Sequence, residues 1–171
     1  MTASVSVDRP AAIRRALRTL VAEKGFHGAS MSAVATQAGV ATGTAYVHYA
    51  SKDDLVLATY LEVKTELGAA VLDGYDPEAA PSERYRHLVH GAYAHLSAEP
   101  ERARFLTQME ESPYHDAAHE QLVAQGDPLA EEAQRPDLVE LLVPLPRDVI
   151  YAMSLGALSY THLTLTTTLN S

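Results

Sequence analysis

Apolar residues recur at helical spacing along the chain, and no stretch alternates between apolar and polar residues as a half-buried strand would. Residues 31–38 are the most regular short example. Four apolar residues there fall at positions i, i+3, i+4 and i+7 of one helical face: Met31, Val34, Ala35 and Ala38. Ser30 is suited to the N-cap of this helix, and Gly39 to the left-handed position that ends it. The pattern predicts an all-α protein.

A second short helix is predicted at residues 42–49, after a three-residue turn that begins at Gly39. Ala45 and Tyr49, four residues apart, are predicted to face the first helix. The other side chains then point outward: Thr42, Gly43, Thr44, Tyr46, Val47 and His48. Two helices joined by a short glycine turn are typical of the helix-turn-helix, whose second helix enters the DNA major groove. By spacing alone, a helical hairpin without DNA affinity explains the pattern equally well.

A longer motif favours DNA. It comprises Gly25-Phe26-His27-Gly28-Ala29-Ser30-Met31, Val34-Ala35, Ala38-Gly39-Val40, Gly43-Thr44, Tyr46, His48-Tyr49 and Ser51-Lys52-Asp53-Asp54-Leu55. This order resembles the TetR/AcrR family of bacterial transcriptional repressors, without a gap from about Arg9 to Leu55. The resemblance implies a DNA-binding head in which residues 42–49 form the recognition helix. Two residues depart from the family: Ala41 replaces the usual serine, which leaves Thr42 as the candidate helix cap, and Ala45 replaces a larger aliphatic residue.

The head is predicted to span residues 1–52. Nine of its residues are predicted to contact DNA: Ser30, Ser32, Thr42, Gly43, Thr44, Tyr46, Val47, His48 and Lys52. Hydroxyl groups and a lysine suit phosphates, whereas small apolar groups suit thymine methyl groups. In the preceding helix, which begins near Pro10, three arginines lie off the apolar stripe and are expected to supply at least one phosphate contact: Arg14, Arg15 and Arg18. Phe26 is predicted to fill the small core of the head.

The distribution of charge agrees with this division. The chain has 171 residues and a net charge of −9, which is unexpected for a protein that binds a polyanion. Residues 1–52 hold six Lys or Arg and two Asp or Glu residues, a net charge of +4. Residues 53–171 hold seven Lys or Arg and twenty Asp or Glu residues, a net charge of −13. A basic head on an acidic body means that only the head should approach DNA.

Residues 53–171 are predicted to form a helical body for effector binding and dimerisation. A helix from about Asp53 to Asp73, some ~30 Å long, would lead out of the head. In the resembled family this helix carries motion between the two parts. Further helices are predicted at about 82–97, 101–111 and 115–125, and the last at Arg147–His162. A weaker segment, bounded by prolines, lies between the last two.

Two further sets of residues are assigned to the body. The resemblance implies an effector pocket, and the aromatic and methionine residues suit a largely apolar molecule, although ordinary core is the competing interpretation. The candidate pocket residues are Tyr85, Tyr93, Phe105, Met109, Tyr114 and Tyr151. The apolar face of the last helix is predicted to dimerise through Val149, Ile150, Met153, Gly156, Ala157 and Tyr160. The family usually follows this helix with a second, which the threonine-rich residues 163–171 do not favour.

Other chemistries have weaker support. Val149–Ser171 has no charged residue, but its many Ser and Thr residues favour a buried helix with a polar tail over a membrane span. His115 and His119, at i and i+4, could serve a metal site, and Ser112 with His115 a hydrolase, but neither has a supporting motif. There is no cysteine, phosphate loop or dinucleotide fingerprint, so no metal or cofactor is assigned. The sequence therefore predicts a cytoplasmic, homodimeric, ligand-responsive repressor that binds double-stranded operator DNA. A helical metal-binding or hydrolytic enzyme, and a helical interaction module without DNA affinity, remain the alternatives.

Overall fold

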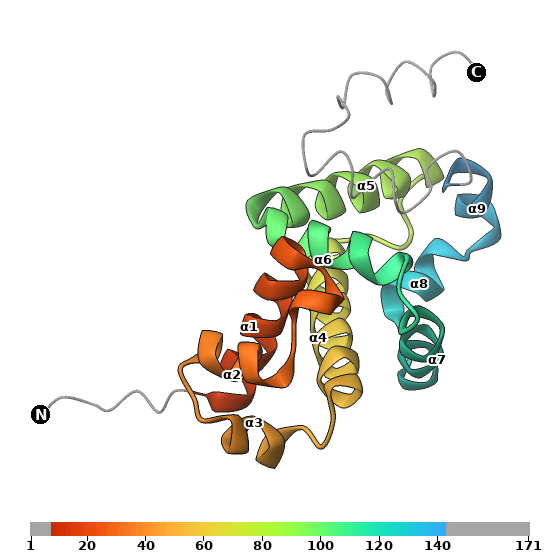
Figure 1. The fold of residues 1–171 in the computed structure, drawn as a ribbon. Helices are drawn as coiled ribbons and strands as arrows, with labels where there is room; N and C mark the ends of the chain where they lie inside the picture. The colour runs from red at the N-terminus through yellow and green to blue at the C-terminus, as the bar shows by residue number, and fades with distance from the viewer. Residues whose placement is uncertain (1–7, 143–171) are drawn as a thin grey trace, which may run out of the picture.

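The computed structural model describes residues 8–142, and all regular structure in this range is helical (Figure 1). The elements are α1 (Arg9–Lys24), the 3-10 turn η1 (Phe26–Gly28), α2 (Met31–Ala38), α3 (Thr42–His48), α4 (Lys52–Leu72), α5 (Pro81–Ala98), α6 (Pro100–Glu110), α7 (His115–Gln125), α8 (Pro128–Ala133) and α9 (Pro136–Leu142). The all-α prediction is confirmed. The predicted dimerisation helix Arg147–His162 lies outside the described residues.

The first two helices of the head begin and end at the residues that their sequence favours. Asp8 caps α1, because its Oδ1 accepts a hydrogen bond from the Ala11 amide at 3.3 Å. Ser30 caps α2 in the same way, accepting from the Ala33 amide at 3.2 Å. Gly39 ends α2 with φ of 70° and ψ of 30°, the left-handed conformation that glycine adopts without steric cost. Gly39 thereby begins the short turn that leads to α3.

α3, which the sequence predicts to be the recognition helix, is short, and no side chain caps its start. Ala41 occupies its N-cap position and makes no side-chain hydrogen bond, while Thr42 is the first helical residue. The prediction that Thr42 caps the helix is therefore wrong. Packing holds α3 in place instead: Ala45 is fully buried against the head, and Tyr49, which follows the helix, is 9% exposed.

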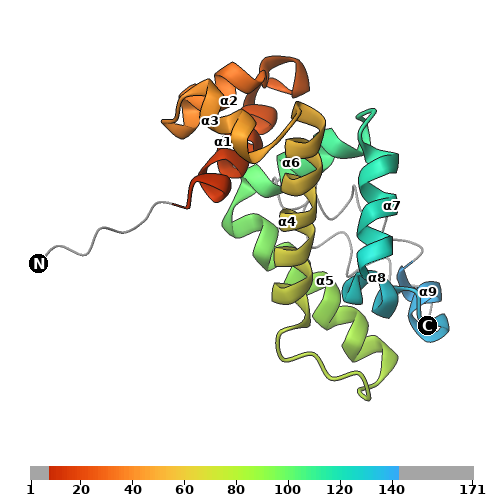
Figure 2. The same cartoon turned by 90° about the horizontal axis from the view of Figure 1, so that it is seen from below.

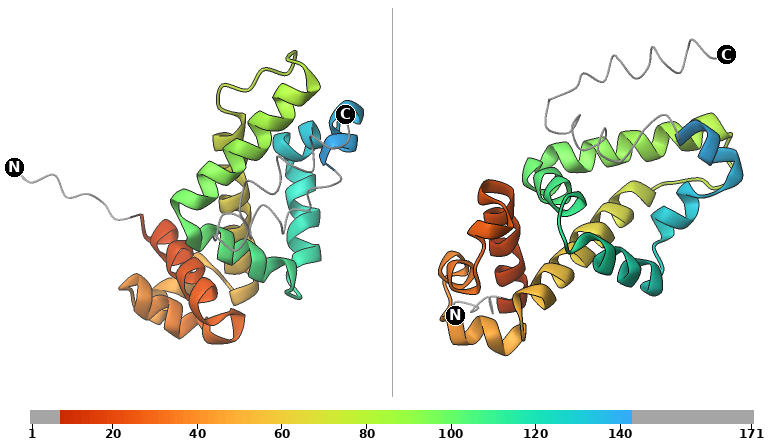
Figure 3. Two further views of the ribbon diagram at one scale, coloured as in Figure 1. Left: turned by 90° about the horizontal axis from the view of Figure 1, so that it is seen from above. Right: turned by 45° about the vertical axis from the view of Figure 1, so that its right-hand side comes forward.

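α4 leaves the head and continues through the body. Ser51 caps it by accepting a hydrogen bond from the Asp54 amide at 3.1 Å, and Asp53 and Asp54 lie in its first turn, where the helix dipole favours negative charge. The helix runs 21 residues, with α5 packed along it and α7 and α8 also in contact with it (Figures 2 and 3). It therefore belongs to both parts of the molecule.

α5 lies unusually close to the end of α4. Gly91 permits this approach, since a Cβ atom added there would lie 3.2 Å from the Cα atom of Val71. His87, on the same side of α5, adds a contact of 3.0 Å between its Nε2 atom and the carbonyl oxygen of Val71. The backbones of the two helices thus approach each other closely near the last turn of α4.

α8 and α9 are attached to α5 by a buried arginine. The guanidinium of Arg84, which is 2% exposed, pairs with Glu132 at 3.2 Å and with Asp137. Tyr75 donates its hydroxyl hydrogen bond to the same Glu132 carboxylate. Burial, followed by this bond to Glu132, raises the pKa of Tyr75 to about 12. The cluster adds to the apolar contact of Leu138, which is fully buried, in fixing the end of the described chain.

The described helices share one continuous core that extends from α1 through α4 to α9. Its largest fully buried side chains include Ile13, Tyr60, Phe105 and Leu138, which come from head and body alike. None of the helices formed by residues 8–142 has both the length and the apolar character needed to cross a membrane.

Candidate nucleic-acid interface

The recognition helix lies at one end of the molecule, remote from α5 and α9, with one side open to solvent (Figure 1). At 100° per residue, Gly43 and Val47 fall on the side of α3 opposite the buried Ala45, and Tyr46 lies on the flank, about 100° from Ala45. The side chain of Tyr46 is 51% exposed and that of Val47 is 81% exposed. Thr42 and His48, at the two ends of the helix, are also exposed, while Thr44 is half-buried. Five of the six residues predicted to face outward are therefore exposed, and Thr44 is the exception.

No feature of the described residues accounts for a glycine at position 43. It is exposed, its φ is not positive, and a Cβ atom added to it would meet nothing within 4 Å. Glycine in a helix costs up to about 1 kcal/mol relative to alanine. Neither backbone conformation nor packing within the chain requires this cost, so the missing side chain leaves room for a molecule outside the chain.

Two of the other three predicted contact residues also have structural roles. Ser30 uses its hydroxyl to cap α2, whereas Ser32 is exposed in the first turn of the same helix. Lys52, the first residue of α4, donates from its Nζ atom to the carbonyl oxygen of Phe26 in η1. An ammonium group has three N–H bonds, so this hydrogen bond and a phosphate contact are compatible. The structure places all nine predicted residues in the head, and their contact with DNA stays a prediction.

Two of the three arginines expected near phosphates have a different role. Arg14 donates from Nε to Glu62 of α4 at 2.8 Å and from Nη1 to the hydroxyl of Tyr49 at 2.7 Å. Arg18, 7% exposed, pairs with Glu101 of α6 through Nε at 2.7 Å. Both guanidinium groups are therefore committed to ion pairs within the protein. Arg15 is the exposed member of the three.

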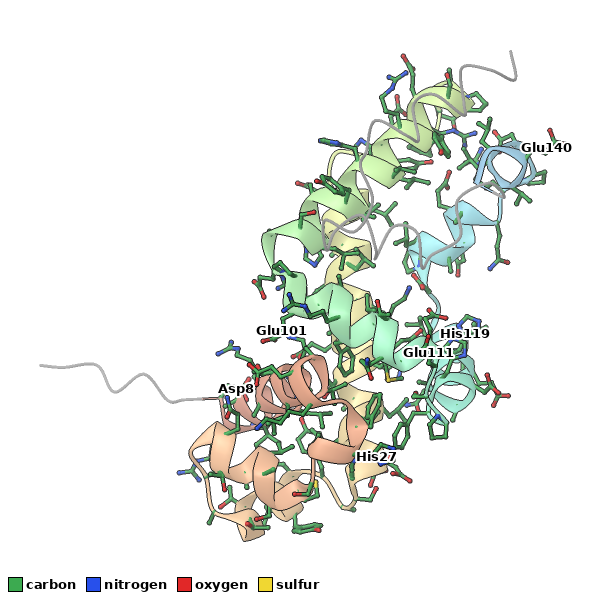
Figure 4. The ribbon with its side chains drawn as sticks, turned by 45° about the horizontal axis from the view of Figure 1, so that its top comes forward. Asp8, His27, Glu101, Glu111, His119 and Glu140 are labelled. Atoms are coloured by element: carbon green, nitrogen blue, oxygen red, sulfur yellow. The ribbon has the colours of Figure 1, made fainter. Side chains whose placement is uncertain are left out.

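The seam between α1 and α6 is charged and partly buried (Figure 4). Glu101 also accepts a hydrogen bond from Thr19 at 2.8 Å, so α1 binds both oxygens of this carboxylate. Behind it, Arg102 bridges Glu66 of α4 at 3.3 Å and Glu99 at 2.9 Å. Burial, and secondly the charge of Arg102, lower the pKa of the neighbouring His95. Head, α4 and α6 thus meet in one ionic network.

Phe26 completes this joint from the other side. Its ring lies 5.0 Å from that of Tyr114 and 6.4 Å from that of Phe105, measured between centroids. The prediction that Phe26 fills the core of the head is therefore wrong, because its ring packs against aromatic residues of the body. Burial, and secondly Asp53 at the start of α4, raise the pKa of Tyr114.

The candidate effector residues do not form one group. Phe105 and Met109 are fully buried in the core, and Phe105 and Tyr114 share the contact with Phe26. Tyr85 and Tyr93 are half-buried on α5. Tyr151 lies outside the described residues, as do all six predicted dimerisation residues: Val149, Ile150, Met153, Gly156, Ala157 and Tyr160. Their assignments stay predictions.

The histidine pair of α7 does not assemble a metal or hydrolytic site. The rings of His115 and His119 are stacked at 5.9 Å, and His115 Nε2 lies 3.3 Å from Glu110. Within residues 8–142, no group of three or more potential ligands is arranged to hold a metal ion. The hydroxyl of Ser112 donates to the carbonyl oxygen of Met109 at 2.8 Å, which directs its proton away from His115.

Comparison with known proteins bears on the same segment. Residues 13–59 match the model of the bacterial regulatory proteins of the tetR family. An uncharacterised HTH-type transcriptional regulator of Haemophilus influenzae is 27% identical over 137 residues, which cover 80% of this chain and 72% of that protein. The fatty acid metabolism regulator protein of Bacillus subtilis is 26% identical over 91 residues, 53% of this chain, and the match spans only 46% of that relative's length.

The fold has solved counterparts over nearly its whole length. A TetR family transcription regulator from Marinobacter aquaeolei superposes with a TM-score of 0.69, covering 92% of this chain and 90% of the other at 24% sequence identity. The likeness therefore includes the helical body as well as the helix-turn-helix.

Proposed function

We propose that this chain, which belongs to the TetR family of DNA-binding transcriptional regulators, is a ligand-responsive repressor released from a palindromic operator by a small, largely apolar effector. The observation that carries the proposal is the joint between head and body. Arg14, Arg18 and Phe26 of the head each have a partner in α4, α6 or the segment before α7. A change in the body therefore has a direct mechanical route to the DNA-binding surface.

The DNA-binding surface is α3 with its flanks. Its outward face offers hydroxyl groups, an imidazole and apolar side chains, and no acidic residue occurs from Ser30 to Lys52. Two such heads, related by a two-fold axis, would place their recognition helices in successive major grooves. Dimerisation is assigned to Arg147–His162, on the family resemblance and the apolar character of that segment, and the cytoplasm is the compartment that such a function requires.

Effector release follows from linkage. A ligand that binds better to a body conformation in which α4 and α6 hold the heads differently shifts the dimer away from the DNA-competent state. The ligand must then weaken DNA binding by the same factor by which DNA weakens ligand binding. The name of the Bacillus relative, a fatty acid metabolism regulator protein, makes a fatty acid the first compound to test. The family is one of regulators and not of enzymes, so a hydrolytic role is not proposed.

The test is a mobility-shift titration of the full chain on the DNA upstream of its own gene, with unrelated DNA of equal length as competitor. The proposal expects saturable binding that the competitor does not abolish, and loss of that binding on addition of an effector. His48→Ala should weaken the specific complex, whereas Arg86→Ala, an exposed change on α5, should not. Equal affinity for operator and competitor would refute the function, and an effector with the same affinity for free and DNA-bound protein is not the inducer.

A further inference from the structure

The outward face of the recognition helix has an unusual chemical composition for a surface that reads DNA. No Arg, Lys, Asn or Gln occurs between Val40 and Ser51. These are the side chains that form paired hydrogen bonds with guanine or adenine in the major groove. The helix therefore lacks the residues that give most direct base recognition, and another kind of contact must supply its sequence preference.

The arrangement on the helix indicates what that contact is. Gly43 and Val47 lie opposite the buried Ala45, each about 160° from it around the helix axis at 100° per residue, so the centre of the outward face is apolar. The hydroxyl groups of Thr44 and Tyr46 belong to the two flanks of this face, about 100° from Ala45, and Thr42 and His48 stand at the two ends of the helix. These polar side chains are placed where the groove walls and their phosphates would be met.

Val47 is the most prominent member of this apolar strip. At 81% exposure it is the most exposed large apolar side chain that the structure describes. A β-branched residue is also a modest helix former, so neither burial nor helix propensity within the chain favours valine there. An isopropyl group projecting from the centre of a recognition helix matches one feature of the major groove, the C5-methyl group of thymine.

We propose that Val47 reads thymine: its side chain packs against the C5-methyl group of a thymine in each operator half-site, and this apolar contact is a main source of base specificity. Gly43, one turn earlier on the same face, lets the helix backbone come close enough for the contact to form. The inference rests on the proposed DNA-binding function and adds the identity of the base that the helix recognises.

The experiment begins by selecting binding sites for the full-length protein from a pool of random duplexes. Each thymine of the enriched site is then replaced in turn by deoxyuridine, which removes only the methyl group and keeps every base-pairing hydrogen bond. At one position per half-site, we expect this replacement to weaken binding about fourfold, or about 15-fold with both half-sites changed, as the loss of one buried methyl contact implies.

The protein variant identifies the residue. With Val47→Ala, the penalty for deoxyuridine at that position should disappear, while penalties elsewhere remain. Val123→Ala is the matched control, because it truncates another exposed valine, 58% exposed, on α7. Melting curves verify that both variants stay folded, which their exposure leads us to expect.

The outcomes are separable. Enriched sites that tolerate deoxyuridine at every position, or a penalty that survives in Val47→Ala, overturn the assignment of Val47 and leave the DNA-binding function standing. A selection that enriches no sequence overturns both the function and the inference.

Discussion

Arg18 of α1 and Glu101 of α6 form an ion pair of 2.7 Å across the boundary between the DNA-binding head and the body. The two residues are 83 positions apart in the sequence, and the Arg18 side chain is 8% exposed. A second oxygen of Glu101 binds Thr19, which orients the carboxylate toward the guanidinium. The pair therefore fixes α6 against the helix that supports the helix-turn-helix.

Removing Arg18 should destabilise the protein well beyond an ordinary surface change. Loss of one partner leaves a partly buried carboxylate without its cation, a type of change that costs about 3 kcal/mol or more. Because the Glu101 side chain is 31% exposed, we expect Arg18→Ala to lower the free energy of unfolding in urea by about 3 kcal/mol, the low end of that range. Arg15→Ala, an exposed change on the same helix, should stay within about 0.5 kcal/mol of the parent. Equal effects of the two changes would contradict a structural role for the pair.

Gly43→Ala should separate stability from DNA binding. Alanine is the better helix former by up to about 1 kcal/mol, and the added Cβ atom meets nothing in the protein. We therefore expect a raised melting temperature together with weaker operator binding in fluorescence anisotropy. The matched change Gly39→Ala should lower the melting temperature, because φ is 70° at Gly39 and a residue with a side chain is strained in that conformation. Operator affinity that is unchanged in Gly43→Ala would show that DNA does not approach this backbone.

His95 should make the protein sensitive to mild acid. Its ring is held among Arg18, Arg102, Glu66 and Glu99, and burial, then Arg102, lower its pKa in the folded state. The unfolded chain therefore takes up a proton first as the pH falls through about 6.5, and stability present above that pH is lost below it.

The measurement is the melting temperature of parent and His95→Gln between pH 7.5 and 5. Glutamine cannot take up a proton, so the variant should lose less stability over this range than the parent. Other groups that titrate are common to both proteins and cancel in the comparison. Parallel curves would exclude His95 as a source of the pH dependence.

Lys52 should contribute to DNA binding without selecting a sequence. If its ammonium contacts a phosphate, Lys52→Met weakens all DNA alike and lowers the slope of log affinity against log salt by about one unit. The exposed Arg86→Met removes a charge from the body instead, and should leave the slope unchanged. A normal slope in Lys52→Met, with lowered stability, would restrict Lys52 to its hydrogen bond with Phe26.

Local signals predicted local structure well. Ser30, Gly39 and Ser51 lie at the helix ends that their side chains or backbone favour, because caps depend on neighbours only a few residues away. The outward face of α3 followed from helical spacing in the same way. The surroundings of Phe26 and Arg18 do not follow from local pattern, because their partners Tyr114 and Glu101 lie more than 80 positions later in the sequence.

Ala41 shows a different limit. A serine or threonine near a helix start is a candidate cap, but whether Thr42 serves depends on where the backbone first turns helical. In the structure the N-cap of α3 is Ala41 and the first helical residue is Thr42, one position earlier than a Thr42 cap would require. The buried residues Ala45 and Tyr49 hold the helix in this register. Effector specificity is a further case, because a pocket is defined by side chains that converge from several helices and no local pattern encodes it.

The joint at Phe26 bears on how such regulators can be recombined. Consider a head grafted from a relative onto this body. Unless that head carries counterparts of Phe26 and Arg18, the body loses the ring that packs against Tyr114 and Phe105 and the guanidinium that pairs with Glu101. A chimera cut at residue 52 would then inherit an orphaned carboxylate and an exposed aromatic surface on its body. The transplantable unit is the head together with the side of α6 that faces it, so the useful cut points are set by contacts in space and not by the helix-turn-helix boundary.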